Sequence, residues 1–238
     1  MSLVILSLLP DRLNVNGDAE NARVLAMRAR WSGVPAEVVT RPPRRPDLVV
    51  IGSGFDAELP ATLSALRRFA GALFEWVETG VPVLAVGTGL ESLCTRIRLG
   101  SHETLPGLGL IPAEAAPAPR RMNGDLIGRS SLGLLVGYEN HDRMLRLADP
   151  GEALADVVHG AGNGDGSEGV VHGSIVGTHL HGPVLAKNPF VADYLLSAAT
   201  GGGYRPSGER IEAVDALARA VRERAIRRIG TGRLARTA

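Results

Sequence analysis

The stretch that decides the fold is Pro82-Val83-Leu84-Ala85-Val86-Gly87-Thr88-Gly89-Leu90-Glu91. A short apolar run enters a glycine-rich corner and a helical pattern leaves it, which indicates a sharp strand-to-helix turn above a sheet. Such a turn, the nucleophile elbow, presents the residue at its apex to a catalytic pocket. The apex here is Gly87, which has no side chain. The sequence therefore predicts an elbow without its nucleophile.

The base that such an elbow needs is predicted further along the chain. Gly177-Thr178-His179-Leu180-His181-Gly182-Pro183 places two histidines at the end of another strand-like run. Because alternate residues of a strand share a face, we expect His179 and His181 on one side of the sheet. Histidine is the side chain most often used as a general base. The base is thus predicted to be present and its partner to be missing.

Strand-like apolar runs alternate with helical patterns through the first half of the chain. This alternation is typical of a parallel sheet with helices on both faces. Beyond residue 107 the runs become shorter and richer in glycine, which favours antiparallel strands. We therefore predict an α/β fold with a mostly parallel sheet and added antiparallel strands. The predicted strands are 4–9, 36–39, 47–51 and 83–86, the antiparallel pieces are 108–111, 125–128, 134–138 and 170–172, and the helices are 18–31 and 61–79.

The C-terminal segment differs from the rest of the chain. After Gly201-Gly202-Gly203, residues 209–229 have the pattern of a basic amphipathic helix. Such a helix either packs on its own domain with solvated arginines or docks to a partner. We predict a domain over residues 1–200, followed by a glycine hinge and this helix over 201–238. The residues expected on its apolar face are Ile211, Val214, Leu217, Ala218, Val221, Ala225 and Ile226.

Composition narrows the class of protein. The chain has 238 residues, 45% of them hydrophobic, which is enough for a sizeable core. Its 26 basic and 25 acidic residues leave a net charge of +1, so no global attraction to nucleic acid or membranes is expected. The apolar run 3–9 is too short to span a bilayer and lacks the flanks of a signal peptide. The single cysteine excludes an internal disulfide and suits the cytoplasm, where we expect this protein.

Two other residues are considered as a displaced nucleophile. Cys94 lies seven residues beyond Gly87, which on a helix is about 10 Å along the axis. We expect it to be a buried structural residue. Thr88 is adjacent to the apex, but a one-residue shift at a sharp turn directs its hydroxyl away from the base. Neither is predicted to replace the missing side chain.

Further motifs reveal a resemblance that covers most of the chain. In their order and spacing they resemble the class I glutamine amidotransferases of the cobyric acid synthase type, and especially the glutaminase subunit of lipid II isoglutaminyl synthase. The family has a flavodoxin-like core. The matching motifs are Asn16-Gly17-Asp18 with Asn21, Gly52-Ser53-Gly54, Gly107-Leu108-Gly109-Leu110, Arg121-Met122-Asn123-Gly124-Asp125, Gly137-Tyr138-Glu139-Asn140-His141, and 177–188 followed by 192–196.

The chain departs from this family at the elbow. The family reads Cys-Gly-Gly-Tyr-Gln where this chain has residues 87–91. In the family the cysteine attacks the glutamine carboxamide as a thiolate, a histidine transfers the proton, and water hydrolyses the thioester. Because Thr88, Leu90 and Glu91 differ as well as Gly87, we interpret the change as drift of the whole loop. Glu91 is expected to oppose the negative charge that develops on an oxyanion.

The resemblance also implies roles for other residues. His181 takes the position of the catalytic base, and His179 takes one where the family usually has tyrosine. Metal binding by this His-x-His pair is an alternative, but no carboxylate or cysteine set lies nearby in sequence, so neither a metal nor a cofactor is predicted. The candidates for the oxyanion site and the pocket are Gly52, Gly54, Thr88 and Glu91, and those for substrate binding are Arg121, Asn140, His141 and His179.

The expected function follows from this combination. The resemblance implies a partner, a Mur-ligase-like ATP-dependent subunit that amidates the D-glutamate carboxylate of lipid II. With its nucleophile lost, this chain is expected to act as a glutaminase-inactive scaffold or regulator of that partner. Two alternatives remain open: an active amidotransferase with a displaced nucleophile, and a free-standing protein that binds glutamine or another small carboxylate or amide.

Overall fold

The central sheet has the strand order of a flavodoxin-like fold. The computed structural model describes residues 2–100 and 103–234, with side chains described as far as residue 230. Within this part the sheet has six strands in the order β11-β12-β4-β3-β1-β2, all parallel except β11. In such sheets ligands bind at the carboxyl ends of the strands. The strands are β1 (Leu3–Ser7), β2 (Ala36–Val39), β3 (Leu48–Ile51), β4 (Val83–Val86), β11 (Val170–His172) and β12 (Ile175–Thr178).

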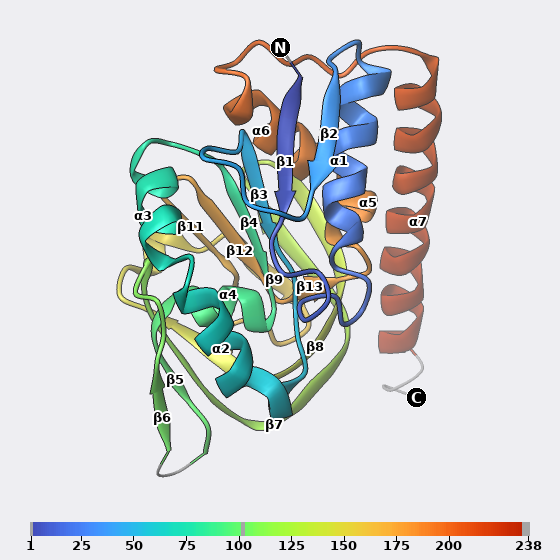
Figure 1. Cartoon of the computed structure of the whole chain (residues 1–238). Helices are drawn as coiled ribbons and strands as arrows, with labels where there is room; N and C mark the ends of the chain where they lie inside the picture. The colour runs from blue at the N-terminus through green and yellow to red at the C-terminus, as the bar shows by residue number, and fades with distance from the viewer. Residues whose placement is uncertain (1, 101–102, 235–238) are drawn as a thin grey trace.

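Helices cover both faces of this sheet (Figure 1). Alternate residues of β3 face the two layers: Leu48 and Val50 pack with Leu25 of α1, whereas Val49 and Ile51 pack with Leu63 of α2. Burial on both faces explains why the central strands β3 and β4 are continuously apolar. The helices are α1 (Glu20–Trp31), α2 (Leu59–Arg67), α3 (Ala70–Glu78), α4 (Thr88–Leu93), α5 (Val184–Lys187), α6 (Pro189–Ala199) and α7 (Glu209–Leu234), with 3-10 turns η1 (Asp56–Glu58) and η2 (Pro150–Glu152).

A second, mostly antiparallel sheet lies over the elbow. Its centre is a long hairpin of β7 and β8, and β8 also pairs with β13, where Tyr138 lies opposite His181. The chain passes from the first sheet to the second at His179, between β12 and β13. This crossing places His179 between the two sheets, where its ring stacks on His141 of β8. The strands are β5 (Cys94–Arg98), β6 (Thr104–Pro106), β7 (Ile111–Ser130), β8 (Gly133–Leu147), β9 (Ala155–His159), β10 (Ser167–Glu168) and β13 (Leu180–His181).

The structure confirms the α/β class and corrects several predicted elements. The helix predicted over 61–79 is two helices, separated by a turn in which the Phe69 N–H bonds the Leu66 carbonyl. The apolar periodicity continues through this turn, so the pattern could not reveal it. The piece predicted at 108–111 is largely outside a strand, because β7 begins at Ile111. Cys94 is not helical, since α4 has only six residues and Cys94 begins β5.

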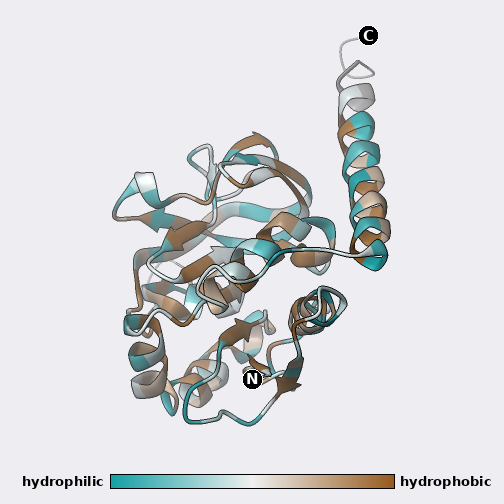
Figure 2. Cartoon of the chain, turned by 90° about the horizontal axis from the view of Figure 1, so that it is seen from above, coloured by the Kyte–Doolittle hydropathy of each residue, from teal (hydrophilic) through white to brown (hydrophobic). Residues whose placement is uncertain are grey.

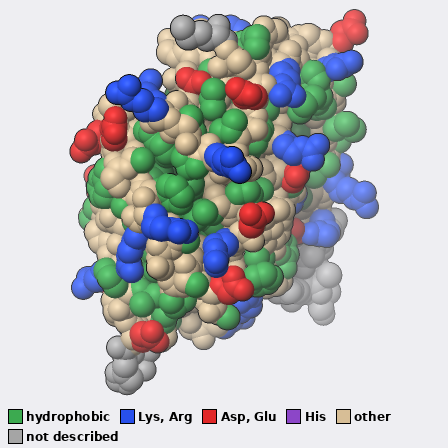
Figure 3. Space-filling view, in the orientation of Figure 1, with side chains coloured by type: hydrophobic (Ala, Val, Ile, Leu, Met, Phe, Trp, Pro, Cys, Tyr) green, Lys and Arg blue, Asp and Glu red, His purple; other side chains and the backbone are tan. Residues whose placement is uncertain are grey.

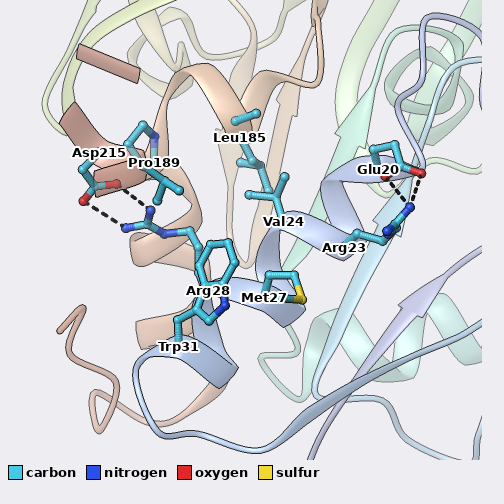
Figure 4. A pocket seen from close by; sticks show the side chains of 11 residues that line it. Glu20, Arg23, Val24, Met27, Arg28, Trp31, Leu185, Pro189 and Asp215 are labelled. Carbon is cyan, nitrogen blue, oxygen red and sulfur yellow. Dashed lines mark hydrogen bonds and ion pairs between the residues drawn. The ribbon is translucent and has the colours of Figure 1, made fainter. Parts of the chain in front are cut away.

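The C-terminal helix α7 lies beside α1 at the edge of the molecule (Figure 1). Buried Arg28 of α1 joins it to the body, because its guanidinium bonds Asp215 of α7 at 2.6 Å and Asp193 of α6 at 2.8 Å. A cavity of about 300 Å³ lies beside this ion pair (Figure 4). Its lining includes Val24, Met27, Trp31, Leu185, Pro189 and Val214.

The apolar residues predicted on one face of α7 are only partly packed against the rest of the protein. Ile211 and Ala218 are buried, whereas Leu217, Val221 and Ile226 are exposed. Both hydrophilic and hydrophobic residues occur along its length (Figure 2). The helix therefore packs along one edge and leaves apolar side chains in contact with solvent.

The surface shows no large region of one charge on the face seen in Figure 3, where basic and acidic side chains are interspersed. This agrees with the near-zero net charge of the chain. Among the described residues, no helix combines the length and the apolar character needed to cross a membrane.

Candidate functional site

The elbow has the geometry that its sequence predicts. Gly87 connects β4 to α4 with φ of 54° and ψ of −124°, a conformation that favours glycine. Its N–H donates to the carbonyl of Thr178 at 2.9 Å, which ties the apex to the end of β12. A Cβ atom at Gly87 would lie 2.5 Å from Ser53 Oγ and 3.2 Å from His181 Cε1. The apex therefore faces both Ser53 and His181.

His181 is held by a carboxylate to which the sequence interpretation assigned no role. Its Nδ1–H donates to the two oxygens of Asp18 at 3.1 and 3.0 Å, and both side chains are buried. Burial raises the pKa of Asp18, although its bonds to His181 and to the Ser53 N–H act against this increase. A histidine oriented through Nδ1 can accept a proton at Nε2. The motif Asn16-Gly17-Asp18 was the available signal for this carboxylate.

Two main-chain N–H groups beside the elbow donate hydrogen bonds to side-chain hydroxyls. The Gly54 N–H donates to Thr88 Oγ1 at 2.6 Å, and the Thr88 N–H donates to Ser53 Oγ at 3.3 Å. These are the donors that an oxyanion would need. Gly52 has a different part in the fold, because a Cβ there would collide with the carbonyl oxygen of Leu13. Its glycine permits close backbone packing beneath the pocket.

Glu91, predicted to place a negative charge beside the oxyanion site, belongs to a buried ion-pair network. Its Oε2 accepts from Arg143 Nε at 2.6 Å, and its Oε1 accepts from His179 Nε2 at 3.3 Å. Burial alone would raise the pKa of Glu91, but the bond from His179 and the charge of Arg143 outweigh it and lower the pKa. Arg143 also pairs with Asp56, which links α4 to the loop after β3.

The sequence interpretation missed Arg143 and Asp56. Arg143 had a usable signal, because Glu139, His141 and Arg143 alternate along β8 and so share a face. Asp56 had none, since an acidic residue in a loop is ordinarily solvated. The two sheets bring Asp56, Arg143 and Glu91 together from three elements of the fold.

His141 and His179 are stacked, with ring centroids 4.3 Å apart and planes at 18°. Burial would lower the pKa of His141, but its contacts with Glu139 and with the Arg143 carbonyl raise it. Burial and the charge of His141 lower the pKa of His179. The stack therefore favours one charged and one neutral ring. His179 and His181 face different partners, Glu91 for the first and Asp18 for the second.

The glycine-rich loop after β9 is held by Glu139. The Glu139 carboxylate accepts the N–H groups of Ala161 at 2.9 Å and Gly162 at 3.0 Å. Burial would raise the pKa of Glu139, but hydrogen bonds from His141 and these N–H groups lower it. His141 contributes indirectly through its contact with Glu139.

Arg121 and Asn140 lie at the mouth of the pocket. Arg121 Nε donates to Asn140 Oδ1 at 2.9 Å, and Nη1 donates to Asp142 Oδ2 at 2.6 Å. Asp56 lies 3.7 Å from the same guanidinium. The cavity has a volume of about 160 Å³. It is lined by Val15, Asn16, Ser53, Gly54, Phe55, Asp56, Gly87, Thr88, Glu91, Arg121, Asn140 and His141.

Cys94 lies outside this pocket in an apolar environment. It is fully buried, its thiol donates weakly to the Leu90 carbonyl at 3.6 Å, and burial raises its pKa. A protonated, inaccessible thiol is a poor nucleophile. Within the described part of the chain, no group of three or more histidine, cysteine, aspartate and glutamate side chains is arranged to hold a metal ion.

Comparison with known sequences identifies related proteins. Residues 4–189 match the CobB/CobQ-like glutamine amidotransferase domain. Subunit GatD of the glutamine-hydrolyzing lipid II isoglutaminyl synthase of Staphylococcus aureus is 31% identical over 206 residues, 83% of this chain and 84% of that relative. Cobyric acid synthase of Mycolicibacterium paratuberculosis is 33% identical over 183 residues, 74% of this chain and 32% of that longer relative.

Solved structures support the fold. A glutamine amidotransferase crystal structure matches with a TM-score of 0.57 at 21% identity, over 82% of this chain and 98% of the other. The structure of PurLQS from Thermotoga maritima matches with a TM-score of 0.58 at 13% identity, over 84% and 99% of the two chains. At such identities the likeness concerns the arrangement of helices and strands.

Proposed function

Because the chain belongs to the CobB/CobQ-like glutamine amidotransferase family, we propose that it is a glutaminase-inactive subunit that serves as scaffold or regulator of a Mur-ligase-like partner in lipid II amidation. The family match agrees with the resemblance predicted from the motifs. The observation that carries the proposal is the elbow apex, Gly87, which faces the His181–Asp18 pair with no thiol. Ammonia for the partner would then come from solution.

The surroundings of Gly87 support the loss of glutamine hydrolysis. Formation of a thioester needs a thiolate at the apex. The single cysteine of the chain, Cys94, is buried in the core away from the apex. Both main-chain donors beside the apex already bond the hydroxyls of Ser53 and Thr88. Arg121, at the mouth of the pocket, donates hydrogen bonds to Asn140 and Asp142. These two side chains compete with any carboxylate ligand for the guanidinium.

An ammonia-release assay tests this part of the proposal. Purified protein with L-glutamine should release no ammonia above a blank without protein. Gly87→Cys alone should not restore full activity, because Thr88, Leu90 and Glu91 also depart from the family's elbow. Glutamine turnover that His181→Ala abolishes would overturn the proposal of inactivity. Full activity of Gly87→Cys would show that the rest of the loop remains competent.

The partnership rests on the relatives and on the outer face of α7. The relative from Staphylococcus aureus is by name a subunit of lipid II isoglutaminyl synthase. On α7, Leu217 is 68% exposed and Val221 is 49% exposed, one turn apart and close to arginines. Apolar side chains with neighbouring arginines are common anchors of protein interfaces. A stable complex would bury at least about 1,000 Å² in total.

Co-expression with a Mur-ligase-like protein encoded beside this chain, followed by size-exclusion chromatography, tests the partnership. We expect co-elution at micromolar concentration, weakened by Leu217→Asp and unaffected by the control Glu20→Ala, which changes an exposed side chain of α1. Separate elution of the two wild-type proteins would favour a free-standing protein that binds a small carboxylate or amide. We place this activity in the cytoplasm, where ATP-dependent amidation of a peptidoglycan precursor takes place.

A further inference from the structure

The Ser53 hydroxyl occupies the space in front of the elbow apex. Its Oγ lies 2.5 Å from the position that a Cβ of residue 87 would take. Only glycine at the apex leaves room for this hydroxyl without displacing it. Ser53 therefore stands close to where an apex residue would hold its nucleophilic atom, although it comes from the loop after β3.

The general base borders the same space. His181 Cε1, the ring carbon between the two nitrogens, lies 3.2 Å from the same Cβ position. Its Nδ1–H donates to Asp18, and no hydrogen bond to Nε2 occurs within the described residues. Asp18 Oδ2 also accepts the main-chain N–H of Ser53 at 3.2 Å. One buried carboxylate thus positions both the base and the residue that bears the hydroxyl.

Other hydroxyls nearby are less suitable. Thr88 Oγ1 accepts the Gly54 N–H at 2.6 Å, which directs its lone pair away from the apex. Ser92 Oγ donates to the Thr88 carbonyl inside α4 at 2.7 Å. Ser53 Oγ makes longer hydrogen bonds with Thr88, at 3.3 and 3.5 Å. These weaker bonds are the ones that break when Oγ attacks a substrate. Catalytic hydrogen bonds often tighten only when substrate binds, so a free-state contact with His181 is not required.

We propose that Ser53 is a nucleophile, with His181 as its general base and Asp18 as the orienting carboxylate, and that this site hydrolyses small activated esters. Ser53 Oγ bonds the carbonyl carbon while its proton passes to His181 Nε2. The proton then goes to the leaving alkoxide as the ester C–O bond breaks. Water, deprotonated by His181, attacks the acyl-serine, and Ser53 recovers its proton as the acid departs.

The oxyanion donors explain why esters are the expected class. The Thr88 N–H donates to Ser53 Oγ, with 3.3 Å between N and Oγ. Once Oγ has bonded the carbonyl carbon of the ester, this N–H can donate to the carbonyl oxygen instead. The Gly54 N–H is already bonded to Thr88 Oγ1. Loss of one donor typically slows acyl transfer by about 10²–10³-fold. Activated esters tolerate this loss better than the glutamine carboxamide, so the inference goes beyond the proposed function without depending on it.

A fluorophosphonate probe, followed by peptide mass spectrometry, tests the nucleophile. The full chain should acquire one adduct on the peptide containing Ser53, none in Ser53→Ala, and at least about tenfold slower labelling in His181→Ala. Ser92→Ala is the matched serine control and should label at the wild-type rate. Circular dichroism and melting temperature check that each variant folds. An absent adduct, or equal rates in wild type and His181→Ala, would overturn the inference.

A thiol provides a second test. Ser53→Cys should react with iodoacetamide at least about tenfold faster than Ser53→Cys/His181→Ala, while buried Cys94 stays slow in both. Equal rates would overturn the inference. Hydrolysis of p-nitrophenyl acetate should fall to background in Ser53→Ala. If wild-type protein also hydrolyses glutamine and Ser53→Ala abolishes this, Ser53 is a nucleophile and the proposed loss of glutaminase activity is wrong. If neither glutamine nor the ester is hydrolysed, the proposed loss of glutaminase activity stands and the assignment of Ser53 as nucleophile fails.

Discussion

Two buried groups of residues meet at the elbow apex and differ in chemistry; we call His181 with Asp18 the histidine wall, and Gly87 with Glu91 and its partners the elbow wall. On the histidine wall, His181 keeps the orientation of a general base, because Asp18 and the pairing of β13 with β8 hold it. On the elbow wall, Gly87 contributes no side chain and Glu91 is bound within an ion-pair network. The base is positioned by two packed sheets, whereas a nucleophile depends on one side chain. The orientation of His181 therefore does not depend on which residue stands at the elbow apex.

The largest loss of stability is expected when the ion-pair network of the elbow wall, in which Glu91 pairs with Arg143, is broken. Glu91→Ala leaves Arg143 buried without its main partner, so we expect a loss of about 3–5 kcal/mol in the free energy of unfolding. Urea denaturation at pH 7 measures it. The control Glu20→Ala removes an exposed pair and should change stability by less than about 0.5 kcal/mol. Equal effects would mean that the buried network does not hold the elbow wall.

A smaller effect is expected at the apex itself. Gly87→Ala forces a Cβ into a positive-φ conformation and against Ser53, so we expect a loss of about 1–3 kcal/mol. Ser53→Gly in the same chain should recover part of the loss, which a double-mutant cycle would report. Gly71→Ala in α3 is the control and should be neutral or stabilising by up to about 1 kcal/mol. A neutral Gly87→Ala would show that the apex accepts a side chain freely.

The stacked rings of His141 and His179 should make the free energy of unfolding depend on pH. The pKa of His141 is raised in the folded state, so its stabilising contribution is complete below the unfolded value of about 6.5 and is lost as pH rises through the folded pKa. The stability advantage of wild type over His141→Gln should therefore shrink as pH increases above about 6.5. Urea denaturation between pH 5.5 and about 9 measures the difference. An advantage that grows with pH would reverse the sign and contradict the charged state of His141.

The smallest effect is expected at the mouth of the pocket. Arg121 is half-exposed, and exposed ion pairs contribute about 0.2–1 kcal/mol, so Arg121→Ala should reduce stability by no more than about 1 kcal/mol. Arg143→Ala, which removes a buried guanidinium paired with Asp56 and Glu91, should cost several times as much. Thermal melts of the two variants provide the comparison. Similar losses would remove the distinction between a solvated mouth and a buried network.

The fold was predictable where local pattern and tertiary role coincide. The strand 83–86 is continuously apolar because both faces are buried, and the structure has it at β4; the edge strand 36–39, which includes Glu37, is found at β2. The division of 61–79 into α2 and α3 was hidden, since both helices present apolar residues to the same sheet. The long β7–β8 hairpin was seen only as fragments, because much of β7 is exposed and carries no strict alternation.

The site was predictable as a set of residues but not as a set of contacts. Gly87, Thr88, His181 and Arg121 line or border one pocket, as the motifs suggested. The pairing of Glu91 with Arg143 joins residues 52 positions apart, one in helix α4 and the other in strand β8. Only the tertiary packing creates this contact, so the sequence could not show that Arg143 and His179 pair with Glu91.

The order of strands in the central sheet has a consequence for synthesis on the ribosome. Strand β4, which carries the elbow, pairs with β12, whose register joins Val86 to Thr178. At translation rates of about 5–20 residues per second, the elbow emerges roughly 5–20 seconds before its neighbouring strand. During that interval one edge of β4 is uncovered, and the nascent chain depends on early docking of β3 and the helices to avoid pairing with another chain.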